Sequence, residues 1–404
     1  MFKKKYGIGT IAFFVAVFSV FTFLFTAVSL NSYYKTRETD FYGDKSYIAK
    51  MSRIDDIIRS SFFFDIDDEQ LEDMMIKGYI EGLGDQFTYY LNPSEAELYS
   101  QASNGEIIGI GIYATYDSEA DSIYVTNVMA GSPAEKAGLV AGDLITKVGD
   151  LDVTQATYYE AIYSVPGKAG TDVTVTVSRY PNYETEEALT LTREKITINS
   201  VSYEMLDNNI AYIKINEFND NTDEQFNELL KQAKTEGAEN IMFDVRNNPG
   251  GNLETVCNIL DELLPSGPIV HIVDKDNNIV QTINSDARET DLPMVVLINR
   301  NTASGGELFC SALRDYEKAT LLGETTFGKG CMQSVRPLDD GSLLVFTTNL
   351  YNPPYGENYH GIGVDPHVEV VMTDEMMKIF SKLTRDEDIQ FQAALNEIAK
   401  LTDK

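Results

Sequence analysis

The stretch LPMVVLINRNTASGGE, residues 292–307, decides the fold of the second half of this chain. Its aliphatic run from Met294 to Ile298 is too short for a helix and predicts a buried strand. Apolar residues then recur at helical spacing, which predicts a helix that reaches about Tyr316. Ser304 therefore lies at a strand-to-helix junction, where the unpaired N–H groups of a helix N-terminus favour a negatively charged oxygen.

Ser304 has two interpretations at this junction. Gly305 and Gly306 leave the backbone beside its hydroxyl uncovered, so that another chain could approach closely, as a nucleophile requires. The alternative is a serine that caps the helix and is followed by a loose glycine turn, which is the commoner arrangement. Deciding between them needs a second group that can take the proton of the hydroxyl.

Lys329 is the candidate for that group, in the stretch GETTFGKGCMQ, residues 323–333. An amine serves as a base when desolvation lowers its pKa towards neutrality. A lysine between two glycines is otherwise an ordinary exposed turn residue, so the local pattern by itself leaves both interpretations open.

Taken together, these motifs resemble the carboxyl-terminal processing proteases, also called tail-specific proteases. The resemblance is carried by the sequences TAS around Ser304 and GKG around Lys329, by Gln333, and by the interval of 329 − 304 = 25 residues. It implies a catalytic dyad of Ser304 and Lys329 that Gln333 supports. It also implies a serine endopeptidase that cuts protein or peptide substrates near their carboxyl termini.

A further motif, DVRNNPGG at residues 244–251, follows a predicted strand and opens a helix. Such a turn presents free N–H groups at a helix start, and the missing Gly-Lys-Ser/Thr ending argues against a phosphate loop. The motif resembles the oxyanion segment of the same family, which implies that the N–H groups of Gly250 and Gly305 bind the tetrahedral oxygen. A helix cap is the alternative interpretation, and the two roles are compatible.

Residues 196–371 are the predicted catalytic domain, and their alternating strands and helices indicate an α/β fold. Strands are expected over residues 210–215 and 241–245, and the stretch from Thr222 to Gln225 predicts a capping box at a helix start. The resemblance implies the more specific fold of crotonase and the Clp proteases. Residues 372–404 are expected to form a helical tail.

Residues 103–195 resemble a PDZ domain, inserted into the catalytic domain or preceding it. The stretch NVMAGSPAEKAGL at residues 127–139 carries much of that resemblance. Pro166 stands where many relatives have an arginine, which puts an arginine-based activation switch in doubt. The resemblance implies that backbone N–H groups of one loop bind the carboxyl terminus of a peptide that adds to the sheet as a strand. That loop consists of Gly109, Ile110, Gly111 and Ile112.

Residues 1–40 contain a membrane signal. Three lysines, Lys3 to Lys5, precede an uncharged run at residues 8–30, which as a helix would be about 34 Å long and would span a bilayer. Lysines on that side favour a cytoplasmic N-terminus, so everything after Asn31 is expected outside the cell, anchored by a single transmembrane helix. A cleaved secretory signal peptide is the alternative.

Residues 41–102 are expected to be helical, with Ile54, Ile57 and Ile58 on one face of a helix. Their last part, GLGDQFTYYLNP at residues 82–93, resembles the segment that precedes the PDZ domain in the same family. We interpret the region as a helical hairpin that packs on the catalytic domain as scaffold, without a role in the chemistry.

Composition excludes several classes of protein. The formal net charge of −31 argues against nucleic acid as a partner, because phosphates would be repelled. The three cysteines are spaced unlike a metal site or a disulfide framework, and Cys310 and Cys331 are expected to be reduced packing residues. No metal and no cofactor is expected, and the sequence gives no oligomeric state.

Two alternatives to the dyad stay open at this point. A Ser-His-Asp enzyme would have to use one of the three histidines, of which His360 is the best candidate, ahead of His271 and His367. The PDZ region could also belong to a binding scaffold whose protease domain is inert. As a further alternative, the chain could be a holdase that binds other proteins in an apolar groove.

Overall fold

The structure, a computed structural model, describes residues 46–402 apart from residues 130, 184, 287, 379 and 381–382. The predicted membrane anchor at residues 8–30 lies outside the described residues. Among the residues that are described, no helix is both long enough and apolar enough to span a bilayer. The chain divides into two compact units, Met1–Met75 and Ile76–Lys404.

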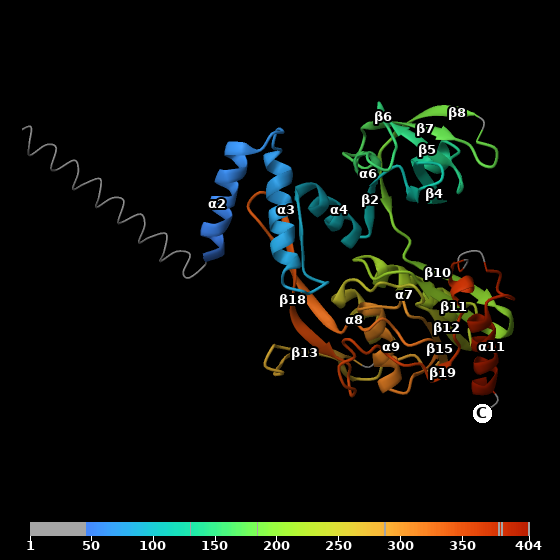
Figure 1. The fold of residues 1–404 in the computed structure, drawn as a ribbon. Coiled ribbons are helices and arrows are strands. Elements are labelled where there is room, and N and C mark those ends of the chain that lie inside the picture. Colours follow the sequence, from blue (N-terminus) through green and yellow to red (C-terminus); the bar gives the residue numbers. More distant parts are fainter. Residues whose placement is uncertain are drawn as a thin grey trace, which may run out of the picture. The chain divides into compact units, whose positions relative to one another are not determined.

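The first unit contains α2 (Ser46–Ser61) and the first half of α3 (Asp68–Glu81) (Figure 1). Arg59 of α2 forms ion pairs with Asp55 at 2.8 Å and with Asp68 at 2.6 Å. The helix is present as predicted, and Ile57 on its apolar face is 58% exposed. Its packing on the catalytic domain stays a prediction.

A six-stranded antiparallel sheet occupies the predicted PDZ region (Figure 1). Its strands run in the order β3-β4-β5-β7-β8, with β6 paired to β5. Val173, Val175 and Val177 alternate inward along β7 and are at most 6% exposed, as the period of a half-buried strand requires. The elements are β3 (Ile112–Asp117), β4 (Ser122–Val128), α5 (Pro133–Lys136), β5 (Leu144–Val148), β6 (Leu151–Asp152), α6 (Tyr158–Ser164), β7 (Asp172–Ser178) and β8 (Glu186–Thr192).

This sheet is inserted into the second unit rather than placed before it. Strand β1 (Tyr89–Leu91) precedes it in sequence, yet pairs with β18 (Leu343–Asn352) near the other end of the chain. After α4 (Pro93–Ser103), β2 (Glu106–Gly109) pairs antiparallel with β9 (Glu194–Thr197). The chain thus enters and leaves the PDZ region side by side, and the segment expected to be helical contributes a strand to the catalytic region.

The catalytic region is built on a sheet of order β10-β11-β12-β15-β16-β19. Strand β10 is antiparallel to β11, and the remaining neighbours are parallel. The predicted strands at residues 210–215 and 294–298 are confirmed, as is the α/β pattern. The strands are β10 (Val201–Leu206), β11 (Ile210–Ile215), β12 (Asn240–Asp244), β15 (Met294–Ile298), β16 (Ala319–Gly323) and β19 (Val368–Glu369), with the 3-10 turn η1 (Asp207–Asn209) before β11.

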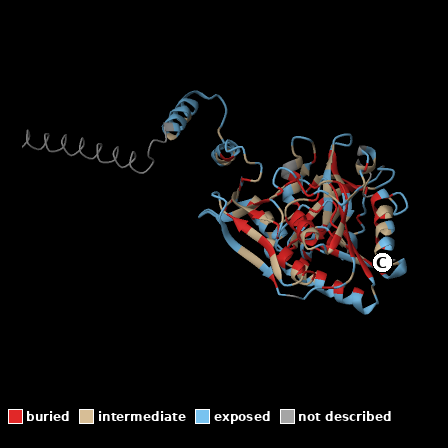
Figure 2. Cartoon of the chain, turned by 90° about the horizontal axis from the view of Figure 1, so that it is seen from below, coloured by how far each residue is buried: buried red, intermediate tan, exposed pale blue. Residues whose placement is uncertain are grey.

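Both faces of this sheet are covered, because alternate side chains of each strand point to opposite sides. On one face, the Phe243 ring lies 6.0 Å from that of Phe226 and 5.3 Å from that of Phe309. On the other face, Met242 packs in a cluster with Phe391. Figure 2 shows these buried layers inside the domain. The covering helices are α7 (Thr222–Thr235), α8 (Leu253–Asp261) and α9 (Gly305–Asp315) on the first face and α11 (Ile389–Thr402) on the second, and the short α10 (Asp374–Lys378) precedes α11.

A second sheet in the same unit carries the lysine side of the candidate site. Its order is β1-β18-β13-β14, and β17 (Cys331–Pro337) pairs with β18. The other two strands are β13 (Gly267–Val273) and β14 (Ile279–Ser285). β17 and β18 form an antiparallel hairpin, which places Gln333 opposite Thr347.

The predicted capping box at Thr222 is wrong. Asn221 occupies the cap position of α7, and Thr222 is already inside the helix. The Thr222 hydroxyl is fully buried, 2.7 Å from Ser200 Oγ and 2.8 Å from Asn219 Oδ1. The Gln225 amide nitrogen donates to the Ile198 carbonyl oxygen at 2.9 Å and to the Asn221 side chain at 2.8 Å. The predicted box with Thr222 as the cap is therefore replaced by a network of Asn221, Asn219 and the distant Ser200.

Candidate active site

Ser304 lies in the turn between β15 and α9, at the cap position of the helix, as predicted. Its φ of 53° and ψ of −117° are rare for a residue with a side chain. The backbone is held by the Glu307 carboxylate, which accepts from the Ser304 N–H at 2.9 Å. A strained strand-to-helix turn of this kind holds a hydroxyl out for chemistry.

The glycines of the 244–251 turn bring that turn into contact with Ser304. A Cβ on Gly250, whose φ is 100°, would lie 2.6 Å from Ser304 Cβ and from Gly305 N. A Cβ on Gly251, whose φ is 142°, would lie 2.0 Å from Phe218 O. Only glycine permits both approaches, so these residues are needed for the two turns to meet.

The N–H groups beside Ser304 differ from the prediction in one respect. The N–H of Gly250 donates to Asn248 Oδ1 at 2.7 Å and is therefore already paired. Gly251 N lies 3.3 Å from the point where a Cβ on Gly305 would stand. Within the described part of the chain, the N–H groups of Gly251 and Gly305 have no hydrogen-bond partner. The free donors at the site are thus those of Gly251 and Gly305, whereas the prediction named Gly250 and Gly305.

Glu307, fully buried on the first turn of α9, connects the serine and lysine segments. Its Oε2 accepts from the N–H groups of Ser304 at 2.9 Å and Lys329 at 2.7 Å. Its Oε1 accepts from Gly328 N at 2.6 Å and from Thr326 Oγ1 at 2.5 Å. One carboxyl group therefore fixes both backbones whose side chains would react.

Lys329 is partly buried, and its Nζ lies 4.9 Å from the centre of the Phe87 ring. Burial lowers the pKa of Lys329 below its usual value, while the charges of Cys331, Asp85 and Glu307 act in the opposite direction. A lowered pKa is the shift that a lysine base requires. No hydrogen bond joins Lys329 Nζ to Ser304 among the residues that the structure describes.

Tyr351 of β18 connects the two candidate groups directly. Its hydroxyl oxygen is 3.1 Å from Ser304 Oγ and 3.0 Å from the carbonyl oxygen of Lys329. The Tyr351 hydroxyl is the donor in both contacts, so its single proton is shared between Ser304 Oγ and the Lys329 carbonyl oxygen. Burial raises the pKa of Tyr351 well above its usual value, which keeps the phenol protonated.

Gln333 lies on β17, and its side chain is directed at neighbours other than Lys329. Its amide nitrogen is 3.3 Å from Thr347 Oγ1 and 3.3 Å from Cys331 Sγ. The three cysteines are free and buried, as expected for packing residues. The supporting role of Gln333 stays a prediction, which would act through Cys331 and Thr347.

The histidines do not supply a base in this structure. His271 Nδ1 is 2.8 Å from Thr282 Oγ1, and His367 Nδ1 accepts from Leu321 N at 2.9 Å. The exposed His360 ring lies 6.1 Å from the Phe87 ring. Across the described residues, none of the three hydrogen-bonds to Ser304, so the geometry does not favour a Ser-His-Asp triad.

The predicted carboxylate loop lies at the start of β3. Gly109 ends β2, and the carbonyl oxygens of Ile110 and Gly111 accept from Ala134 N at 2.8 Å and Met129 N at 2.9 Å. Gly111 has φ of 80°, and Ile112 begins the strand beside which a peptide would add. The loop is ordered by its carbonyl groups, and its role in binding stays a prediction.

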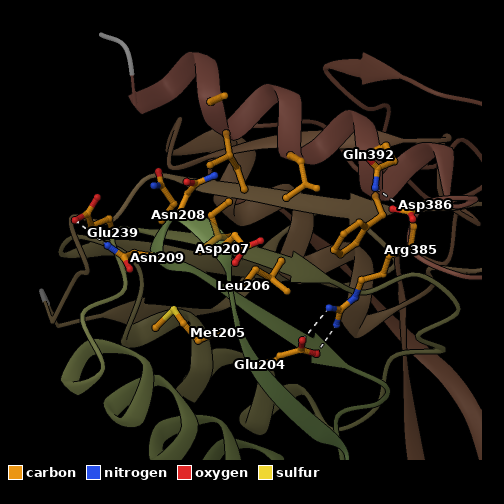
Figure 3. Close-up of a pocket in the computed structure, with 16 residues that line it drawn as sticks. Glu204, Met205, Leu206, Asp207, Asn208, Asn209, Glu239, Arg385, Asp386 and Gln392 are labelled. Carbon is orange, nitrogen blue, oxygen red and sulfur yellow. Dashed lines mark hydrogen bonds and ion pairs between the residues drawn. The ribbon is translucent and has the colours of Figure 1, made fainter.

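A pocket of about 850 Å³ lies away from these residues (Figure 3). It is lined by the end of β10, by the starts of β11 and β12 at Ile210 and Asn240, and by α11. Arg385 at its rim pairs with Glu204. Ser304 follows the other, carboxyl end of the parallel strands, where α/β folds place their reactive groups. The pocket is therefore separate from the candidate active site.

Three residues of the site, Glu307, Tyr351 and Phe87, were not predicted from the sequence. Glu307 completes the pattern Ser-x-x-Glu beginning at Ser304, so a capping-box search could have found it. Tyr351 and Phe87 have no local signal, because they meet Lys329 only in the folded chain. Through Phe87, the segment at residues 82–93 contacts Lys329, and its interpretation as scaffold stays a prediction.

Comparison with known proteins agrees with this geometry. Residues 209–370 match the family model described as peptidase family S41, and residues 124–179 match a PDZ domain model. The chain is 33% identical over 366 residues to a "Probable CtpA-like serine protease" of Staphylococcus aureus (strain COL), covering 90% of this chain and 71% of that one. It is 32% identical over 325 residues to the "Carboxyl-terminal-processing protease" of a Synechocystis species, covering 80% and 75%. A solved structure from Bacteroides fragilis, assigned to the S41 proteases, matches in fold with a TM-score of 0.54 at 16% identity, covering 86% and 97%.

Replacing Glu307 by glutamine tests the buried carboxyl. An amide has a single acceptor oxygen, so two of the four donors would face an NH2 group and remain unpaired, at about 1–3 kcal/mol each. We expect Glu307→Gln to lower the free energy of unfolding by about 2–4 kcal/mol in a denaturant titration. The exposed Glu228→Gln should change it by less than about 0.5 kcal/mol. Equal values for the two variants would show that the four hydrogen bonds do not hold the turns.

Proposed function

The chain belongs to peptidase family S41 and is a serine endopeptidase with a PDZ domain, and we propose that Ser304 and Lys329 form its catalytic dyad. The observation that carries the proposal is the shared support of the two residues. Glu307 binds the N–H groups of both, and Tyr351 contacts the Ser304 hydroxyl and the Lys329 carbonyl. An inert scaffold or a holdase would have no need of this arrangement.

In the proposed reaction, the free amine of Lys329 takes the proton of the Ser304 hydroxyl as Oγ attacks the scissile carbonyl carbon. Nζ must first move away from the Phe87 ring and form a hydrogen bond with Oγ of Ser304. The N–H groups of Gly251 and Gly305 would stabilise the negative charge that develops on the carbonyl oxygen. Lys329 then returns the proton to the leaving amine, and water hydrolyses the acyl-enzyme by the same sequence.

The dyad is tested with the full chain and an unfolded protein substrate. Lys329→Ala should lower kcat/KM by about 100- to 10,000-fold, because the base is lost. Lys329→Arg should not restore activity, since guanidinium stays protonated. The matched control changes His271, His360 and His367 together, which should leave substantial activity. Full activity in Lys329→Ala, or loss of activity in a folded His360→Ala protein, would overturn the dyad.

The direction in which activity changes with pH follows from the lowered pKa of Lys329. Because burial lowers the pKa of Lys329, the base is present in free form at a lower pH than in an ordinary lysine. Activity should therefore rise with pH as the ammonium loses its proton and fall in acid.

We also propose that the PDZ domain selects substrates by their carboxyl termini, binding the terminal carboxylate at the N–H groups of residues 109–112. The resemblance to carboxyl-terminal processing proteases supports this role, as does the position of the loop at the start of β3. Amidating a substrate peptide removes the charge that the loop would bind. We expect weaker binding of the amidated peptide by fluorescence anisotropy, and equal affinity for the two peptides would exclude the carboxylate loop.

The membrane anchor and its orientation form a further proposal, supported by the three lysines before the uncharged run at residues 8–30. The anchor would hold the catalytic region outside the cytoplasm, at the cell membrane. A protease added to intact cells should then digest the region after residue 41, as seen by immunoblotting. Protection of that region until the cells are lysed would reverse the orientation.

We further infer that the catalytic domain shares the fold of crotonase and the Clp proteases. Its support is the mainly parallel sheet covered by helices on both faces. Superposing a crystal structure of this chain on a Clp protease would test the inference, and a different strand order would refute it.

A further inference from the structure

The segment between α3 and α4 is fixed beside the catalytic region at Asp85, Thr88 and β1. The Asp85 carboxylate accepts from Phe87 N at 3.0 Å and from Thr88 Oγ1 at 2.6 Å. Thr88 Oγ1 in turn accepts from Thr347 N of β18 at 3.1 Å. Together with the β1–β18 pairing, these bonds determine where the Phe87 side chain lies.

Phe87 is directed at the proposed base. Its ring centre lies 4.9 Å from Lys329 Nζ, within the range in which an ammonium is attracted to an aromatic face. The ring is flanked by Phe327, at 6.4 Å between ring centres, and by His360, at 6.1 Å. Phe87 is therefore part of an aromatic cluster that covers Lys329 on the side of the segment between α3 and α4.

Both members of the proposed dyad have other partners in this arrangement. The Ser304 hydroxyl is engaged with Tyr351, and Lys329 Nζ is engaged with Phe87. Attack by Ser304 requires Nζ to leave the ring and bind Oγ. The strength of the contact with Phe87 therefore contributes to the free energy that is needed to bring Nζ to Oγ.

We propose that Phe87 is a positioning residue for Lys329, whose ring excludes water from Nζ and holds the charged amine in place until the residue is needed as a base. This proposal rests on the proposed function of Lys329. The ring has two opposing effects: excluding water disfavours the ammonium, whereas the negative face of the ring favours it. Loss of the aromatic face alone should lower the pKa of Lys329. Entry of water should raise it.

The other titratable groups around Nζ come from separate elements. Asp85 faces it from the segment between α3 and α4, Glu307 from α9 and Cys331 from β17, while His360 lies behind the Phe87 ring. Although burial acts in the opposite direction, hydrogen bonds from Thr347, Thr88 and Phe87 N hold the pKa of Asp85 below its usual value, so its charge is constant near neutrality. Burial raises the pKa of the Cys331 thiol, which is thus neutral there.

The experiment compares Phe87→Leu, Phe87→Ala and Phe87→Tyr in the purified full chain. Leucine keeps an apolar cover but has no aromatic face, so the acid limb of kcat/KM should move to lower pH by about 0.4–1.5 units. Alanine also removes the aromatic face, but it admits water to Nζ, and because burial is the largest influence on the pKa of Lys329 the limb should move to higher pH. Tyrosine keeps the ring and should retain the native limb. Phe63→Leu, at a 90% exposed phenylalanine, is the matched control and should have no effect.

Opposite shifts for leucine and alanine support the proposal, because a merely structural role would not reverse the direction. Shifts in the same direction, or no shift in a folded protein, would overturn it. His360→Gln identifies any part of the limb that belongs to the histidine.

A second readout separates this proposal from the proposed function. In Ser304→Ala protein, which cannot form the acyl-enzyme, the pKa of Lys329 is followed by NMR of its dimethylated amine, assigned through Lys329→Arg. The same opposite shifts should occur there. If cleavage persists in Lys329→Ala but the NMR shifts hold, the dyad fails while the contact between Phe87 and Lys329 stands. Unchanged NMR titrations would refute the contact whatever the activity.

Discussion

The buried carboxyl group of Glu307 is the interaction on which the rest of the site depends. Its two oxygens receive hydrogen bonds from the Ser304 turn on one side and from the segment between Thr326 and Lys329 on the other. A carboxyl group is suited to this position because both of its oxygens accept, and the groups that reach it are three backbone N–H groups and the Thr326 hydroxyl. Ser304 follows a strand of one sheet, and Lys329 precedes a strand of the other. The Glu307 carboxyl group joins these two segments.

A second buried network joins the turn at residues 244–251 to the segment just before α11. Arg246 pairs with Asp244 at 2.6 Å and with Asp388, just before α11, at 2.8 Å, and all three are largely buried. Tyr212 adds a hydrogen bond to Asp244 at 2.8 Å. Removing one member of such a network is strongly destabilising, because the partner charges stay buried without compensation. The helical tail therefore supports the turn that carries Gly250 and Gly251.

The inserted PDZ region and the segment before it reach the catalytic region from the same stretch of chain. Strand β1 enters the β18 sheet just before the chain departs through β2, and β9 returns beside β2. Phe87 lies two residues before β1, so the position of its ring over Lys329 depends on this pairing. Movement of the segment between α3 and α4 would thus change the surroundings of the lysine.

The sequence by itself determined the main strands and helices of the catalytic region and the positions of the candidate residues Ser304 and Lys329 on them. The aliphatic run from Met294 to Ile298 could form only a buried strand, and the glycines at 250, 251 and 305 marked turns that need a bare backbone. Only the tertiary structure decided the partners of those groups. Gly250 N is paired and Gly251 N is free, and Thr222 bonds to Ser200 rather than capping a helix. Phe87 and Tyr351 meet Lys329 from separate segments of the chain, the one before β1 and the other on β18. The physical reason is that a local pattern specifies backbone conformation, whereas hydrogen bonds and ring contacts between distant segments depend on how the sheets pair.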